Sequence, residues 1–311
     1  MTKPILRAPV PASVSDAAQE ILAVPPLPRA PLPAPDDMAG WLRQVEQTNA
    51  YMAAEFAAEE VPVEVEDREI AGVLTYVAGV DDGGPVYLGI HGGALIYGSG
   101  TFCRFVAAMD AMTSGMLAWG PDYRTAPRHP YPAALDDCVA VYRALLDIRD
   151  PADVFVGGVS AGGNLAAALM LRARDEGLPM PAALMLGTPE VDLTESGDSF
   201  NVLDGVDNTL GRLLEVNRLY ANGHDLADPY LSPLFGDLTG FPPTFLHTGT
   251  RDLFLSNTVR VHRKMRQAGV EAQLQVFEGL SHAQYYRDIK SPETIDYNNE
   301  VARFFDKHLG R

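Results

Sequence analysis

Residues 153–164 read DVFVGGVSAGGN, and the rest of the sequence can be interpreted outward from this segment. The run VFV at 154–156 is typical of a buried strand, and residues 165–171 have a helix-forming composition. The pattern G-x-S-x-G lies between them. Its glycines permit a sharp turn that exposes the Ser160 hydroxyl, with the Ala161 N–H at the start of a helix. The alternative is a glycine-rich loop in which Ser160 only caps the helix.

Apolar runs with strand-like composition lie on both sides of this segment and alternate with helix-like stretches. The other expected strands are Val61–Glu66, Glu69–Val77, Pro85–Ile90, Met116–Trp119, Ala182–Leu186, Thr244–Leu246 and Ala272–Phe277. The expected helices are Ser15–Val24, Asp36–Glu59, Phe102–Ser114, Ala133–Asp147, Asn164–Glu176, Asn257–Ala268 and Thr294–Leu309. This alternation predicts an α/β fold whose mostly parallel central sheet carries helices on both faces.

Composition narrows the classes of partner. The chain of 311 residues has 41 acidic and 24 basic side chains, a net charge of −17, which argues against nucleic acid and anionic membranes as partners. No apolar run is long enough to span a membrane, and the N-terminal region lacks the apolar centre of a signal peptide. The two cysteines, Cys103 and Cys138, cannot form a disulfide framework, which favours a cytoplasmic location.

A serine hydroxyl is a weak nucleophile, so Ser160 would need a histidine base and a carboxylate to orient that base. In a strand–turn–helix setting both partners follow the serine, the acid first, on loops after strands. The histidines after Ser160 are His224, His247, His262, His282 and His308. His282 alone follows an expected strand through a short loop, whereas His247 lies within an apolar strand and is expected in the core. His282 is therefore the predicted base.

Asp252 is the predicted orienting carboxylate, because it ends the loop GTRD (249–252) that follows the strand beginning at Thr244. The alternative is that Asp252 only caps the next helix. Glu278 is closer to His282 in sequence but leaves the same strand end, so it is poorly placed to reach behind the ring.

The segment HGGA at 91–94 follows the expected strand Pro85–Ile90 and predicts an oxyanion hole. Gly92 and Gly93 carry no side chains, so their N–H groups can point at a developing oxyanion, and the Ala161 N–H would add a third donor. The alternative is a glycine turn that merely ends the strand.

Several sequence blocks together resemble the bacterial hormone-sensitive-lipase-like family of α/β-hydrolases, from about residue 60 onward. They are HGGALIYGS (91–99), DYRTAPRHPYPAALDD (122–137), GVSAGGN (158–164), PEVDLT (189–194), DLFLSN (252–257) and GLSHAQ (279–284). The resemblance implies an α/β-hydrolase fold with a helical cap, and hydrolysis of carboxylic esters without a metal or organic cofactor. It implies a cap built from residues 1–60 and 196–227, on a core of 61–195 and 228–311. It also allows a homodimer.

Three positions depart from the family pattern. Val159 stands where the family has Asp or Thr, and Ala94 replaces the last glycine of an HGGG motif. If residue 94 requires a positive φ, alanine costs on the order of 1 kcal/mol there. Glu190 replaces an aromatic residue near the expected pocket, so Ala94 and Glu190 are both candidate pocket residues. Glu190 could select a polar or cationic substrate, but an ion pair is the favoured expectation.

The sequence thus predicts a serine hydrolase that cleaves esters of short to medium acyl chain through an acyl-enzyme intermediate. In this mechanism Ser160 attacks, His282 moves the proton and Asp252 orients the imidazole. A lactone or amide hydrolase with the same three residues is one alternative. A small-ligand receptor that has lost catalysis is the other.

Overall fold

The computed structural model describes residues 8–25, 31–56, 61–286 and 290–309. Its sheet has eight strands in the order β1-β2-β4-β3-β5-β6-β7-β8. They span Val65–Ile70 (β1), Val73–Ala78 (β2), Val86–Ile90 (β3), Leu117–Pro121 (β4), Val154–Val159 (β5), Ala183–Gly187 (β6), Thr244–Gly249 (β7) and Ala272–Phe277 (β8). β2 pairs antiparallel with β1 and β4, and all other neighbours are parallel. The predicted mostly parallel sheet is confirmed.

The first hairpin differs from the prediction. A break at 67–68 was expected between two strands, but β1 runs through these residues and pairs Ile70 with Val73. The turn lies at Ala71 and Gly72, which have φ angles of 51° and 81°, as tight hairpin turns require. β1 is an exposed edge strand, so its polar residues Asp67 and Arg68 fit solvent and do not interrupt it.

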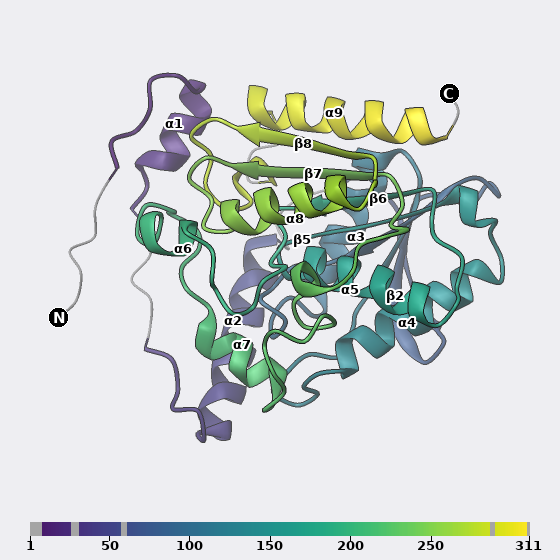
Figure 1. The fold of residues 1–311 in the computed structure, drawn as a ribbon, viewed down its shortest axis with the longest axis horizontal. Helices are drawn as coiled ribbons and strands as arrows, with labels where there is room; N and C mark the ends of the chain where they lie inside the picture. Colours follow the sequence, from purple (N-terminus) through teal and green to yellow (C-terminus); the bar gives the residue numbers. More distant parts are fainter. Residues whose placement is uncertain (1–7, 26–30, 57–60, 287–289, 310–311) are drawn as a thin grey trace.

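Helices cover both faces of the sheet (Figure 1). They span Asp16–Ala23 (α1), Met38–Phe56 (α2), Thr101–Ser114 (α3), Ala133–Leu146 (α4), Ala161–Asp175 (α5), Ser199–Val202 (α6), Leu214–Ala221 (α7), Leu255–Gln267 (α8) and Pro292–His308 (α9). α3 and α9 pack together on one face, and α4, α5 and α8 cover the other. The expected helices are thus present with shifted ends. Residues 57–59, expected in the second helix, lie outside the described ranges, as does part of the proline-rich segment.

Alternating strand residues build the two halves of the core. Val154 and Val156 of β5 join the cluster under α4 and α5, whereas Phe155 points to the opposite face and contacts the Phe305 ring of α9. Because both faces are covered, these strands are apolar throughout, which explains their strong sequence signal.

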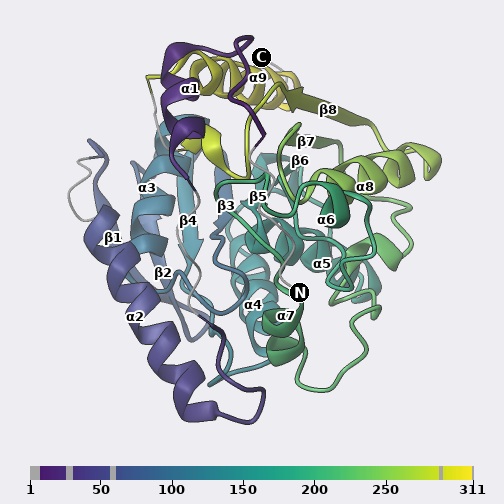
Figure 2. The same cartoon turned by 90° about the vertical axis from the view of Figure 1, so that its left-hand side faces the viewer.

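Four helices gather at the end of the sheet where the parallel strands finish. In Figure 1, α1, α2, α6 and α7 lie on the left, the direction in which β7 and β8 point, and Figure 2 looks onto them. α2 buries Trp41 in the main core. These helices come from the segments predicted to form a cap, and they surround the strand ends that carry the expected site residues.

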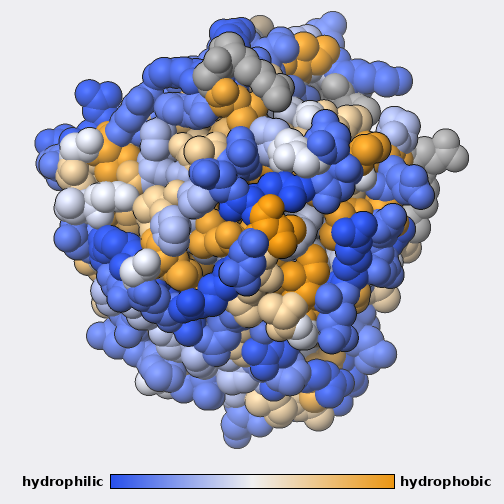
Figure 3. Space-filling model, turned by 90° about the vertical axis from the view of Figure 1, so that its right-hand side faces the viewer, coloured by the Kyte–Doolittle hydropathy of each residue, from blue (hydrophilic) through white to orange (hydrophobic). Residues whose placement is uncertain are grey.

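The molecule presents a mixed surface. Figure 3 shows the opposite end, where hydrophobic residues form separate patches among hydrophilic ones. None of the helices in the described ranges combines the length and apolar character needed to cross a bilayer.

Candidate active site

Ser160 occupies a sharp turn between β5 and α5. Its φ of 61° and ψ of −121° are unusual for a residue with a side chain, and such backbone strain costs on the order of 1–3 kcal/mol. The flanking glycines make the turn possible: a Cβ on Gly158 would lie 2.4 Å from the carbonyl carbon of Gly162. A Cβ on Gly162 would lie 1.9 Å from the Ile90 oxygen. The sequence therefore folds here so that the serine hydroxyl projects at the end of the sheet.

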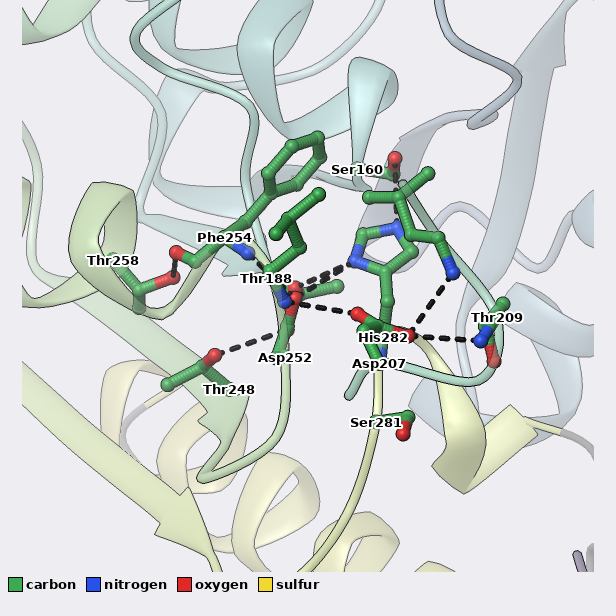
Figure 4. A network of polar contacts seen from close by, with 12 residues as sticks. Ser160, Thr188, Asp207, Thr209, Thr248, Asp252, Phe254, Thr258, Ser281 and His282 are labelled. Carbon is green, nitrogen blue, oxygen red and sulfur yellow. Dashed lines mark hydrogen bonds and ion pairs between the residues drawn. The ribbon is translucent and has the colours of Figure 1, made fainter. Parts of the chain in front are cut away.

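The structure brings Ser160, His282 and Asp252 together (Figure 4). His282 Nε2 lies 3.0 Å from Ser160 Oγ, and His282 Nδ1 lies 3.0 Å from Asp252 Oδ1. Asp252 follows β7 and His282 follows β8, so neighbouring strands deliver acid and imidazole to the same edge. Among the described residues, only His282 forms a hydrogen bond with the Ser160 side chain.

Further donors fix the Asp252 carboxylate. Thr248 Oγ1 donates to Oδ2 over 3.0 Å, the Phe254 N–H donates to Oδ1 over 2.8 Å, and the Thr188 hydroxyl also donates to Oδ2. Thr188 directly follows β6 and also lies 3.0 Å from His282 Nδ1. Sequence reasoning missed Thr188, although its position after a central strand was a usable signal.

Electrostatic interactions favour the charged forms of both Asp252 and His282. Burial opposes ionisation of Asp252, but His282 and the hydrogen bonds from His282, Thr188 and Phe254 outweigh it and lower the pKa of Asp252. Burial likewise opposes a charge on His282, but the Asp252 carboxylate outweighs it and raises the pKa of His282. An imidazolium at this position is therefore stabilised.

Free backbone donors lie beside the serine. A Cβ on Gly92 would stand 3.5 Å from Ser160 Cβ, which places this glycine against the turn. In the described part of the chain, the Gly92 and Gly93 N–H groups donate to no protein acceptor. The Ala161 N–H begins α5 and has no acceptor within the helix. The geometry leaves all three predicted donors available.

The loop that carries these glycines is held from behind. Tyr123 Oη donates to the His91 oxygen over 2.9 Å, and its ring stacks on the His91 imidazole at 4.1 Å. From α2, Gln44 donates to Tyr97 Oη over 3.0 Å, and Asn49 Oδ1 accepts from the Gly98 N–H over 2.8 Å. The N-terminal segment therefore contacts the loop directly.

The departures from the family pattern have defined environments. Ala94 has a φ of 53°, so the condition for strain at this position is met. Val159 is partly buried against the core on the α9 face, an apolar contact where the family has a polar residue.

His247, expected in the core, is fully buried with Nε2 3.2 Å from Tyr286 Oη.

Glu190 does not form the expected ion pair, so that expectation is wrong. Its N–H donates to the Ser160 oxygen over 3.1 Å, and its side chain is buried. Neither carboxyl oxygen has a hydrogen-bond or ion-pair partner within the described ranges. Burial raises the pKa of Glu190 to about 8, a change that the nearby Asn217 amide partly offsets. Burial therefore favours the neutral form of the Glu190 carboxyl, because Asn217 and His282 compensate its charge only in part.

One group of side chains has the composition of a metal site. His91, Cys103 and Asp122 place one ligand atom each within 4.8 Å of one another. Burial raises the pKa of the Cys103 thiol well above its usual value, which disfavours the thiolate that a metal would need. The proposed chemistry of Ser160 does not require this group.

Comparisons with known proteins agree with this architecture. Residues 87–286 match a family model described as alpha/beta hydrolase fold. An esterase of Acinetobacter venetianus is 37% identical over 69% of this chain and 72% of its own, and an acetyl-hydrolase of Streptomyces hygroscopicus is 32% identical over 68% and 71%.

Solved structures give the same result over almost the whole chain. A crystal structure of an esterase superposes with a TM-score of 0.87 at 36% identity, covering 99% of this chain and 98% of its own. An esterase from the bacterial hormone-sensitive lipase family superposes with a TM-score of 0.81 at 28% identity, covering 90% and 100%. The family model, the relatives and the structures together show that the chain belongs to the bacterial hormone-sensitive-lipase-like family of α/β-hydrolases.

Proposed function

We propose that this protein is a carboxylic ester hydrolase in which Ser160 is the nucleophile, His282 the base and Asp252 the orienting acid. The continuous hydrogen-bonded chain from Ser160 Oγ through the imidazole to the Asp252 carboxylate carries this proposal. The names of the relatives, esterase and acetyl-hydrolase, support the same reaction class.

In the first half-reaction His282 Nε2 takes the Ser160 proton while Oγ attacks the ester carbonyl. The oxyanion lies against the N–H groups of Gly92, Gly93 and Ala161, and each such donor is typically worth about 10²–10³ in rate. Asp252 holds Nδ1 protonated and stabilises the imidazolium. His282 then protonates the leaving alcohol, which leaves an acyl group on Ser160.

In the second half-reaction a water molecule takes the place of the alcohol. His282 removes a proton from the water as it attacks the acyl carbonyl, and the same N–H groups donate hydrogen bonds to the new oxyanion. Collapse of this intermediate returns the proton to Ser160 and releases the acid. Because His282 acts first as base and then as acid in both halves, the rigid support of Asp252 serves both.

The cap assignment also stays a proposal. We expect residues 1–60 and 196–227 to shape the pocket for a short to medium acyl chain, because α2 contacts the glycine loop and Asn217 of α7 lies beside Glu190. The free cysteines Cys103 and Cys138 support a cytoplasmic location. A homodimer remains a prediction that sedimentation would test.

The test is Ser160→Ala, assayed on p-nitrophenyl esters of increasing acyl length and on lactones. Wild type should cleave short esters, and the variant should lose almost all turnover while its circular dichroism spectrum is retained. A fluorophosphonate probe should label wild type at Ser160. A variant that keeps most of its activity, or a wild type that the probe does not label, would contradict the proposal.

A further inference from the structure

Asp207 is a second buried carboxylate near the site, and the proposed chemistry does not use it. It lies in the segment between α6 and α7 and is completely inaccessible to solvent. A buried carboxylate is costly unless donors surround it, so its partners indicate its role.

The donors on Oδ2 come from both loops of the site. The Leu253 N–H donates over 2.9 Å and the His282 N–H over 3.3 Å. Leu253 directly follows Asp252, so one oxygen contacts the main chain of the acid loop and of the base loop. Figure 4 shows Asp207 beside these two loops, on the opposite side of the histidine from Ser160.

The other oxygen, Oδ1, fixes its own segment. It accepts from the Thr209 N–H over 2.9 Å and from the Leu210 N–H over 3.0 Å. The adjacent Asn208 N–H donates to Ser281 Oγ over 3.3 Å, and its side chain donates to the Ile21 oxygen of α1 over 2.9 Å. Asp207 and the adjacent Asn208 therefore join the 196–227 segment to the N-terminal helix and the His282 loop.

Two titratable groups act on Asp207 from these elements. Burial and the Asp252 carboxylate raise the pKa of Asp207, while His282 and the Leu210 and Leu253 N–H groups act in the opposite sense. In return, Asp207 is one of the carboxylates that favour the imidazolium form of His282, with Asp252 and Glu190 as the others.

We infer that Asp207 is a positioning residue, which sets the spacing between the Asp252 and His282 loops and adds negative charge behind the imidazole. The inference rests on the proposed function for its kinetic consequence. Its structural consequence, the environment of the His282 ring, can be measured without substrate.

Asp207→Asn is the informative variant. The asparagine amide has nearly the same shape, but it has one acceptor oxygen, and its NH₂ group must face one of the two pairs of N–H donors. We expect kcat to fall roughly 10- to 100-fold, as small misplacements of catalytic groups do, with KM nearly unchanged. The imidazole pKa of His282 should fall by roughly one pH unit, because a nearby negative charge is removed.

Asp192→Asn is the matched control. Asp192 is also fully buried in the same part of the chain, but its oxygens accept from Thr194, Ser196 and Arg260. This variant loses a comparable carboxylate without touching either loop. Its kcat should stay within about twofold of wild type when corrected for the folded fraction.

The two readouts are kcat and KM on a short p-nitrophenyl ester, and NMR titration of the His282 ring without substrate, assigned with His282→Gln. The inference is overturned if Asp207→Asn lowers only thermal stability, with kcat and the His282 titration unchanged. It is also overturned if Asp192→Asn reproduces both effects. If wild type cleaves no ester the proposed function fails, and the NMR titration alone then decides for or against Asp207.

Discussion

Replacing Glu190 by Gln should make the protein more stable at alkaline pH, although the carboxyl is close to the proposed site. Burial raises the pKa of Glu190 from 4.5 to about 8, with Glu195 and Asp192 adding to this effect and Asn217 and His282 partly offsetting it. Glutamine has the shape of the protonated acid and does not titrate, so it copies the form that the folded state prefers.

The direction of the pH dependence follows from the protons that the folded and the unfolded chain bind. Between pH 4.5 and about 8 the folded protein holds a proton on Glu190 that the unfolded chain has released. The stability contributed by the protonated form is therefore complete below pH 4.5 and is lost as the pH rises through about 8. At about 1.4 kcal/mol per pH unit, titration of Glu190 over this range changes the free energy of unfolding by on the order of 5 kcal/mol. The advantage of Glu190→Gln should grow steadily with pH and level off near pH 9.

The assay is equilibrium unfolding in urea at pH values from 5 to 9, followed by tryptophan fluorescence, for wild type and variant. Other titrating groups cancel in the difference between the two free energies of unfolding. Asp192→Asn is the control: hydrogen bonds from Ser196, Thr194 and Arg260 outweigh burial and lower the pKa of Asp192. Its loss should therefore cost stability over this whole pH range, with only the small pH dependence that the Asp192 charge exerts through Glu190. Parallel stability curves for Glu190→Gln and wild type would refute the reasoning.

Two further predictions concern the glycine loop and the base. Ala94→Gly should raise the free energy of unfolding by about 1 kcal/mol, because alanine at a φ of 53° is strained. The midpoint temperature of unfolding in calorimetry should therefore rise by roughly 2 °C, and a lower midpoint temperature would contradict this. The value of kcat/KM should rise with pH as His282 loses its proton. Because the Asp252 charge outweighs burial and raises the pKa of His282, the midpoint should lie above 6.5, and a midpoint below 6.5 in a pH–rate profile would contradict the described electrostatics.

The fold was largely predictable because central parallel strands are buried on both faces. Runs such as Val86–Ile90 and Val154–Val159 are apolar throughout, so composition alone marks them. The β1–β2 hairpin was misplaced for the opposite reason. An edge strand needs no apolar pattern, and the Ala71–Gly72 turn carries no asparagine or aspartate to mark it.

Sequence reasoning proposed Ser160, Asp252 and His282 because each follows a strand and the three occur in a fixed order along the chain. Thr188 follows strand β6 but is neither an acid nor a base at neutral pH, and Asp207 follows no strand. Thr188 matters only because β6 lies beside β7, which brings its hydroxyl to Asp252. Asp207 matters only because its segment folds back onto two loops that are distant in sequence. Such roles arise from tertiary contacts, and local pattern does not encode them.

Glu190 and Asp207 show how hydrogen-bond donors modify the effect of burial on an acid. Both are carboxyls inside the same region, and both interact electrostatically with His282. Asp207 accepts from four main-chain N–H groups, two of which, those of Leu210 and Leu253, act against the burial that raises its pKa, whereas the Glu190 oxygens have no partner in the described ranges. Burial holds the pKa of Glu190 near 8, so its charge reaches His282 only in alkaline solution. Asp252, Asp207 and Glu190 each favour the imidazolium when they carry a charge, and for Glu190 burial shifts that condition to alkaline pH.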